Sequence, residues 1–172
     1  ALSRRLLNRS VYRFLGVSPE CCDFMVQRQG LPSEKVERLD LGVDTDIFRP
    51  DDLARQAARA EYGLPLDASV VVQTGKLTLE KSPHLLARAM APIMRDDPKV
   101  WLVFVGAAPA EYAREIVEPL AKAAVDDRLL FIPLVPVSKL VEIFNLADIC
   151  VYPGESSLSC LEAAACGKPV IV

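Results

Sequence analysis

The last twenty residues of the chain, from Pro153 to Val172, constrain its fold more than any other stretch. An apolar run ends at Tyr152, and Pro153 and Gly154 break it, as is typical after a buried strand. Serines suited to a helix N-cap follow, then apolar residues at helical spacing, and Gly167 fits the end of that helix. A second apolar run reaches Val172. This order predicts a strand–helix–strand unit, and therefore a parallel sheet with a right-handed crossover.

Two glutamates bracket the predicted turn. Glu155 and Glu162 are seven residues apart, so on one helix they would share a face and lie roughly 10 Å apart along its axis. Carboxylate pairs that hydrolyse glycosidic bonds are closer, at about 5 to about 9.5 Å, so this spacing suits two groups that hold separate hydroxyls of one extended ligand. The free N–H groups of Ser156, Ser157 and Leu158, at the helix start, would attract an anion such as a diphosphate. A solvated acidic pair near a helix start explains the same spacing without a ligand.

A strand predicted over residues 70–74 ends in a short basic loop. Gly75 and Lys76 follow the strand directly, and Lys81 precedes a helix start at which Ser82 is the expected N-cap. Cations at the carboxyl end of a strand, beside helix N–H groups, form an anion site. Surface lysines are common, so a solvated loop is the alternative interpretation of these residues.

The alternation of apolar runs and helical periodicity continues through the rest of the chain. The predicted elements are a helix over 51–62, a strand over 100–106, a helix over 110–125, a strand over 128–132 and a helix over 138–146. Pro119 should kink or break the helix that contains it. Together these elements predict an α/β fold with a Rossmann-like parallel sheet and helices on both faces.

The first fifty residues follow a different pattern. A strand is predicted within 11–17, a helix over 19–29 with Ser18 as its N-cap, and a short strand within 35–41. The chain begins with a helix end and an unpartnered strand, and it stops inside an apolar strand. We therefore expect a fragment of a longer protein, truncated at both ends.

Composition excludes several classes of function. Of the 172 residues 51% are hydrophobic and 25% are charged, which is typical of a globular domain. The net charge is −3 without a basic run, so nucleic acid is not an expected partner. No run of apolar residues is long enough for a transmembrane segment. The five cysteines show no CxxC spacing, which predicts reduced thiols in a cytoplasmic protein and no metal site.

Three segments resemble the family 4 retaining glycosyltransferases, enzymes of the GT-B fold. Pro153–Val170, with the sequence PGESSLSCLEAAACGKPV, is similar to their glutamate motif, Gly75–Lys81 to their GR-x4-K segment, and Gly42–Pro50 to their interdomain linker. The resemblance implies that this chain is one half of a GT-B fold. It assigns residues 1–41 to the end of an N-terminal acceptor domain and its lead-in, 42–50 to the linker, and 51–172 to a nucleotide-sugar-binding domain that is incomplete at its C-terminus.

The resemblance also implies roles for individual residues. Glu155 would hold the donor sugar and Glu162 the ribose, while Lys76 and Lys81 would stabilise the leaving diphosphate. Lys76, Lys81 and Glu155 are therefore the expected catalytic residues. Lys76 stands where the family has arginine, which keeps the charge but loses bidentate geometry. The chain has six residues between its two glutamates, where the family usually has seven, and no glycine among them.

The remaining expected contacts to the donor come mainly from backbone groups. Gly75 and the helix start at Ser156, Ser157 and Leu158 would contact the donor phosphates and sugar. In the family, backbone groups that follow the third strand touch the base. Pro133 lacks an N–H, so these contacts would fall to Leu134 and Val135.

The implied reaction is transfer of a hexosyl-type sugar from a nucleotide diphosphate sugar to a hydroxyl acceptor, without a metal or another cofactor. A glycan, lipid or small-molecule acceptor would bind the missing N-terminal domain, so the fragment alone should be inactive. The expected location is the cytoplasm, including the cytoplasmic face of the membrane. Two alternatives stay open: a GT-B nucleotide-sugar epimerase and a non-catalytic nucleotide-sugar-binding module.

Overall fold

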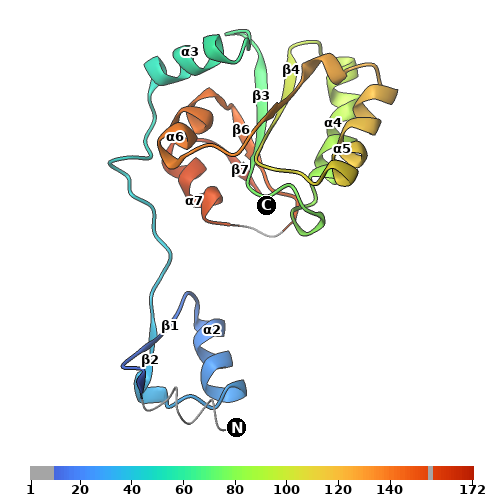
Figure 1. Ribbon diagram of the computed structural model, residues 1–172. Coiled ribbons are helices and arrows are strands. Elements are labelled where there is room, and N and C mark those ends of the chain that lie inside the picture. Colours follow the sequence, from blue (N-terminus) through green and yellow to red (C-terminus); the bar gives the residue numbers. More distant parts are fainter. Residues whose placement is uncertain (1–9, 155–156) are drawn as a thin grey trace. The chain divides into compact units, whose positions relative to one another are not determined.

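A computed structural model describes residues 10–154 and 157–172 of the chain (Figure 1). The chain divides into two compact units, residues 1–42 and residues 43–172. The first unit holds β1 (Phe14–Gly16), α2 (Pro19–Asp23), the π-helical turn η1 (Phe24–Arg28), the 3-10 turn η2 (Ser33–Lys35) and β2 (Val36–Arg38). Its two strands pair in parallel. The Ser18 side chain accepts a hydrogen bond from the Cys21 N–H at 3.2 Å, which confirms the predicted cap.

The second unit alternates helices and strands. Its elements are α3 (Asp52–Glu61), β3 (Ser69–Thr74), the 3-10 turn η3 (Leu79–Lys81), α4 (Pro83–Asp96), β4 (Val100–Val105), α5 (Ala110–Lys122), the 3-10 turn η4 (Asp126–Arg128), β5 (Leu129–Ile132), α6 (Val137–Leu146), β6 (Ile149–Val151), α7 (Leu158–Ala165) and β7 (Val170–Ile171). The five strands are ordered β5-β4-β3-β6-β7, and all neighbours are parallel. The predicted Rossmann-like parallel sheet is confirmed.

Helices cover both faces of this sheet (Figure 1). One apolar core combines β3 residues Val70 and Val72 with residues of α3, α6 and α7. The other combines Val71, the alternate residue of β3, with residues of α4 and α5. Burial on both faces explains why the strands appear in the sequence as continuous apolar runs.

The strand order locates a switch point. From β3 the chain first builds outward through β4 and β5, and then returns to the other side of β3 to add β6 and β7. In open parallel sheets, ligands bind beyond the carboxyl ends of the strands at such a point. The two segments that leave the sheet there are Gly75–Lys81 after β3 and the segment that follows β6 from Pro153. We call this end of the sheet the carboxyl edge, and the opposite end the amino edge.

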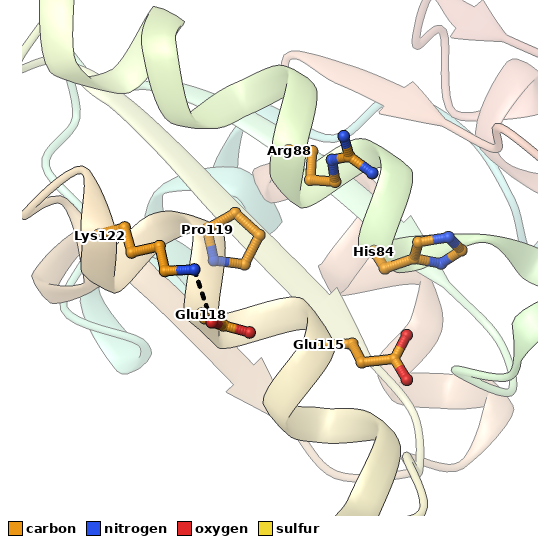
Figure 2. Close-up of a pocket in the computed structure, with 6 residues that line it drawn as sticks. All are labelled: His84, Arg88, Glu115, Glu118, Pro119 and Lys122. Carbon is orange, nitrogen blue, oxygen red and sulfur yellow. Dashed lines mark ion pairs between the residues drawn. The ribbon is translucent and has the colours of Figure 1, made fainter.

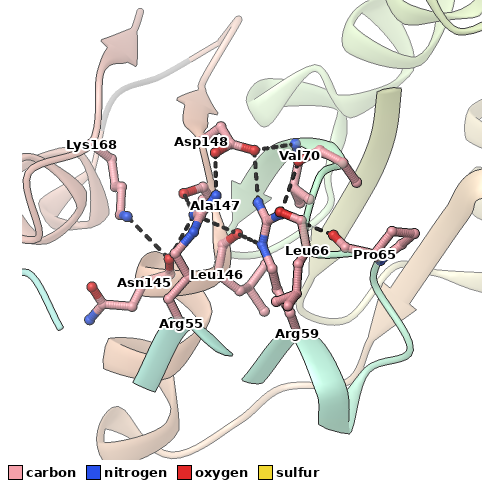
Figure 3. Close-up of polar contacts among 11 residues, drawn as sticks. Arg55, Arg59, Pro65, Leu66, Val70, Asn145, Leu146, Ala147, Asp148 and Lys168 are labelled. Atoms are coloured by element: carbon pink, nitrogen blue, oxygen red, sulfur yellow. Dashed lines mark hydrogen bonds and ion pairs between the residues drawn. The ribbon is translucent and has the colours of Figure 1, made fainter. Parts of the chain in front are cut away.

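A partly buried ionic network ties β3 to β6 at the amino edge (Figure 3). Arg59 has no exposed surface, and its guanidinium donates to Asp148 at 2.8 Å and to the carbonyls of Pro65, Leu66, Ala68 and Leu146 at 2.8–3.0 Å. Asp148 also accepts a hydrogen bond from the Val70 N–H at 2.7 Å and pairs with Arg55. Burial alone would raise the pKa of Asp148, but the Val70 N–H and the two guanidinium groups outweigh it and hold that pKa below its usual value.

Two local expectations differ from the structure. The expected break at Pro119 is wrong, because α5 continues through it to Lys122 with Ile116 and Leu120 fully buried around it, while the expected kink stays a prediction. Those packed side chains hold the helix although one backbone hydrogen bond is lost. Ser82 stands at the N-cap position of α4 but makes no capping bond, since its φ of 50° is left-handed and its hydroxyl donates to the Leu79 carbonyl at 3.1 Å.

The C-terminal strand–helix–strand unit has the predicted order. Gly167 ends α7 with a left-handed φ of 70°, and the N–H groups of Gly167 and Lys168 donate to the carbonyls of Ala164 and Ala163. That pair of bonds is a Schellman motif. The helix begins only at Leu158, and Ser157 at its N-cap position makes no side-chain capping bond. Glu155 and Ser156 lie outside the described residues, so the distance expected between the two glutamates stays a prediction.

Candidate functional site at the carboxyl edge

The loop after β3 is fixed by its neighbour after β4. The Gly75 N–H donates to the Val105 carbonyl at 2.9 Å, and the Leu77 N–H donates to the Ala107 carbonyl at 3.0 Å. The Leu77 side chain is 1% exposed and belongs to the core beneath α4 and α5. Lys76 lies between these two anchored residues and is itself exposed. Its backbone is therefore held at the edge while its charge faces solvent.

Gly106 allows the two loops to come this close. Its φ is 139°, and a Cβ at this position would lie 1.9 Å from the Gly75 carbonyl oxygen. A side chain at Gly106 would therefore displace the backbone that carries Lys76.

The turn that carries Lys81 meets the segment after β6. Lys81 ends the 3-10 turn η3, where its N–H donates to the Thr78 carbonyl at 3.1 Å. A Cβ on Gly154 would lie 2.1 Å from the Glu80 carbonyl oxygen and 2.9 Å from Lys81 Cα. The two segments therefore pack backbone against backbone, which brings the lysine turn to the residue that precedes Glu155. The roles of Lys76, Lys81, Glu155 and Ser156 stay predictions.

Glu162 lies on the inner face of α7. It is 9% exposed, whereas Leu158 and Leu161 on the same helix are each 41% exposed. Burial raises the pKa of Glu162, and a hydrogen bond from Ser159 opposes that shift. A buried carboxylate with little solvent can accept further hydrogen bonds from a ligand that carries hydroxyl groups.

Tyr152 connects the strand ends to α7, and the sequence pattern gave no sign of this role. Its hydroxyl shares a hydrogen bond with Thr74 Oγ1 at 3.0 Å and donates to the Ser159 carbonyl at 3.3 Å. The side chain is 2% exposed, and burial raises the pKa of Tyr152 far above its usual value. Tyr152 thus stays protonated and holds β3, β6 and the first turn of α7 together.

A pocket of about 330 Å³ lies at the carboxyl ends of β4 and β5. Its lining residues are Gly106, Ala107, Ala108, Ala113, Phe131, Ile132, Pro133 and Leu134. Leu134 is 80% exposed, so it is available to a ligand, whereas Val135 is half-buried and packs against the core. Of the two residues expected to contact a base, only Leu134 lines this pocket.

A second pocket, of about 420 Å³, lies between α4 and α5 (Figure 2). Its lining residues are His84, Arg88, Glu115, Glu118, Pro119 and Lys122, and Glu118 pairs with Lys122 at 2.6 Å. His84 Nδ1 shares a hydrogen bond with the Tyr112 hydroxyl, which joins the start of α4 to α5. None of the residues predicted from the sequence for ligand binding lines this pocket.

The described residues contain no group of three or more His, Cys, Asp or Glu side chains arranged to hold a metal ion. All five cysteines are free. Burial raises the pKa of Cys150 to about 12 and that of Cys166 to about 11, so both thiols stay protonated at neutral pH. None of the helices within the described ranges has the length and apolar character needed to cross a membrane.

Comparison with known proteins gives both sequence and structural matches. Residues 54–172 match the family described as "Glycosyl transferases group 1". The D-inositol 3-phosphate glycosyltransferase of Acidothermus cellulolyticus is 35% identical over 157 residues, which cover 86% of this chain and 35% of that protein. The enzyme of the same name from Geodermatophilus obscurus is 38% identical over 140 residues, or 76% of this chain and 31% of that protein. The chain thus spans about a third of the length of these relatives.

Two solved structures show the same fold. HepE from Anabaena, crystallised with UDP and glucose, superposes with a TM-score of 0.78 at 20% identity, covering 98% of this chain and 46% of HepE. Sucrose-phosphate synthase from Thermosynechococcus elongatus superposes with a TM-score of 0.74 at 26% identity, covering 98% of this chain and 42% of that protein.

Proposed function

The chain belongs to the group 1 glycosyl transferase family, and from this premise we propose that it forms the donor-binding half of a retaining glycosyltransferase. The proposed reaction transfers a hexosyl group from a nucleotide diphosphate sugar to a hydroxyl acceptor. Residues 51–172 would bind the donor, 42–50 would link the domains, and 1–41 would end the acceptor domain. The curated relatives are about three times as long as the matched region, which supports an acceptor site in the rest of such a protein.

The packing of Gly154 on the Lys81 turn, at the switch point of the sheet, carries this proposal. It joins the segment that leads to Glu155 with the turn of the second lysine, on the edge where parallel sheets bind ligands. Negative charge grows on the diphosphate as the bond to the sugar breaks. The ammonium groups of Lys76 and Lys81 would stabilise that charge, together with the N–H groups at the start of α7.

Glu162 supports binding of the ribose. Its carboxylate is largely withdrawn from water, so ionisation is costly until other donors replace the water. The two vicinal hydroxyls of a ribose supply two donors to one carboxylate. Glu155 would bind the sugar of the donor. The proposed reaction uses no metal or other cofactor.

The pocket beside Leu134 supports binding of the base. Its lining is apolar apart from backbone groups. The apolar side chains would pack against the flat ring of the base, and backbone groups would form hydrogen bonds with the polar atoms at the edge of that ring. HepE was crystallised with UDP, which makes UDP-sugars the first donors to test. The relatives are named for D-inositol 3-phosphate, which makes that compound the first acceptor to test. A cytoplasmic location is part of the proposal, supported by the unpaired cysteines.

Calorimetry of the chain with UDP, GDP and ADP tests the donor site. We expect one nucleotide to bind, with an affinity that falls as salt is added. Lys76→Ala and Lys81→Ala should each weaken binding by about 1–3 kcal/mol. Lys99→Ala is the matched control, since Lys99 is an exposed lysine at the amino edge that pairs with Asp67 at 2.8 Å. Absence of binding by all three nucleotides would contradict the proposal.

The products formed from the donor distinguish a glycosyltransferase from a nucleotide-sugar epimerase and from a non-catalytic binding module. The full-length protein should form a glycosylated acceptor with the anomeric configuration of the donor. Free nucleotide and an isomerised sugar in the absence of acceptor would indicate the nucleotide-sugar epimerase. Donor binding without any turnover, across a panel of hydroxyl acceptors, would indicate the binding module.

A further inference from the structure

Gln73 is a buried amide inside an apolar strand. It is 1% exposed and pairs in register with Phe104 of β4. Alternation along β3 places it on the same face as Val71, toward the apolar core under α4 and α5. An apolar side chain of similar size would satisfy this position, so the amide calls for an explanation beyond packing.

The nitrogen of the Gln73 amide has a hydrogen-bond partner, whereas its oxygen has none among the described residues. Nε2 donates a hydrogen bond to the Lys81 carbonyl at 2.7 Å. Oε1 is buried and has no hydrogen-bond partner among the described residues. Exchanging the two ends would set the amide oxygen against the carbonyl oxygen, so the acceptor fixes the orientation. Gln73 therefore leaves one polar atom unsatisfied, which lowers stability, and makes one bond, which goes to the turn of a predicted site residue.

That bond links the Lys81 turn to the central strand of the sheet. Within the turn the Lys81 N–H donates to the Thr78 carbonyl, and the turn also packs against Gly154. Ser82, which follows, has a left-handed φ of 50°, so the chain changes direction directly after Lys81. The Lys81 carbonyl is bonded to the Cα that carries the side chain, so a displacement of this carbonyl would also displace the lysine side chain.

We propose that Gln73 is a positioning residue, which fixes the Lys81 turn on β3 so that the Lys81 ammonium meets the diphosphate of the nucleotide. The inference deepens the proposed function and rests on it. Gln73 itself touches no ligand, because its side chain is covered by protein.

Gln73→Met tests this role, since methionine is unbranched, similar in size and without a donor. We expect the affinity for the nucleoside diphosphate that the wild-type chain binds to fall about tenfold. The thermal midpoint should change little, because removal of the unpaired oxygen offsets loss of the hydrogen bond to the Lys81 carbonyl. Val71→Ala is the control on the same strand face: it should lower the thermal midpoint and leave affinity unchanged. Gln73→Leu removes the same donor and serves if Gln73→Met does not fold.

A double-mutant cycle with Lys81→Ala distinguishes positioning from a general loss of structure. If Gln73 acts through the Lys81 side chain, Gln73→Met should have no further effect on affinity in the Lys81→Ala background. An equal loss in both backgrounds overturns the inference, as does wild-type affinity in Gln73→Met alone. Absence of nucleotide binding by the wild-type chain overturns the proposed function first, and this inference with it.

Discussion

The two edges of the parallel sheet are built in opposite ways. At the amino edge, Arg59 is fully buried and bonded to a carboxylate and several carbonyls, and Asp148 bonds two arginines and a backbone N–H (Figure 3). At the carboxyl edge, Gly75 and Gly106 adopt backbone angles that other residues rarely reach, and the amide oxygen of Gln73 has no partner in the described part of the chain. The buried guanidinium at the start of the sheet is fully bonded, whereas the buried amide near its end has one oxygen left unsatisfied by the described residues.

The carboxylates of the two edges show the same contrast. Burial acts on both, but at Asp148 the Val70 N–H and two guanidinium groups outweigh it and lower the pKa. At Glu162 burial dominates and raises the pKa against a single hydrogen bond from Ser159. The protein therefore stabilises the charged form of Asp148 at one edge, and it does not do so for Glu162 at the other.

The largest expected effect is at the amino edge. Arg59→Leu leaves a carboxylate and buried carbonyls without their donor, and should lower the free energy of unfolding by about 3–5 kcal/mol. Urea denaturation measures this as a lower midpoint with an unchanged slope. Arg55→Leu is the matched control, because the Arg55 side chain is 25% exposed and water can replace part of its bonding. An equal decrease in the free energy of unfolding of the two variants would show that burial of Arg59 makes its bonds no more stabilising than those of Arg55.

Gly106→Ala tests the carboxyl edge. The strained φ and the contact with the Gly75 carbonyl should together lower the free energy of unfolding by about 2–4 kcal/mol, and the displaced loop should weaken nucleotide binding. Gly63→Ala separates the two causes: Gly63 has a φ of 67° but no atom within 4 Å of an added Cβ. That control should cost about 1–2 kcal/mol and leave binding intact. If both alanine variants bind nucleotide equally well, the contact between the loops is not needed for the site.

Glu162→Gln should affect binding more than stability. Loss of the charged acceptor should weaken nucleotide binding by about 2–3 kcal/mol, measured by calorimetry with the free nucleoside diphosphate. Glu155→Gln serves as the comparison, because it should chiefly weaken binding of the sugar conjugate. Unchanged affinity of Glu162→Gln for the free nucleotide would remove the ribose assignment.

The fold was predictable because parallel strands buried on both faces leave apolar runs in the sequence. Such runs gave the strands of the sheet, and the parallel direction placed Lys76, Lys81 and the segment after Tyr152 at one edge. The contact between Gly154 and the Lys81 turn could not be foreseen, because it depends on β6 pairing with β3 although 74 residues separate Thr74, the end of β3, from Ile149, the start of β6.

The buried polar residues were missed for a related reason. Arg59 lies in an amphipathic helix, where a charged residue is normally solvated, and its acceptors come from residues 65–68, 146 and 148. Gln73 lies in a strand predicted from its apolar residues, and its acceptor, the Lys81 carbonyl, lies in the turn beyond that strand. In α7 the apolar spacing does not reveal the buried face, because Leu158 and Leu161 are exposed while Glu162 and Ala163 are buried. Local periodicity cannot detect partners that only the tertiary fold supplies.

The smallest expected effect, the pH dependence of stability, compares the two edges most directly. A lowered pKa means that Asp148 stabilises the fold above its usual value of 3.8, and that this stabilisation disappears as the pH falls through the folded pKa. A raised pKa means that Glu162 favours the fold below its usual value of 4.5, and that stability decreases as the pH rises through the folded pKa. At pH 7, Asp148→Asn should therefore be less stable than wild type and Glu162→Gln more stable. Both differences should shrink on acidification, and thermal denaturation between pH 3 and pH 8 measures them. If Glu162→Gln is the less stable protein at pH 7, its carboxylate is already compensated within the chain, and the contrast between the two edges does not extend to their charges.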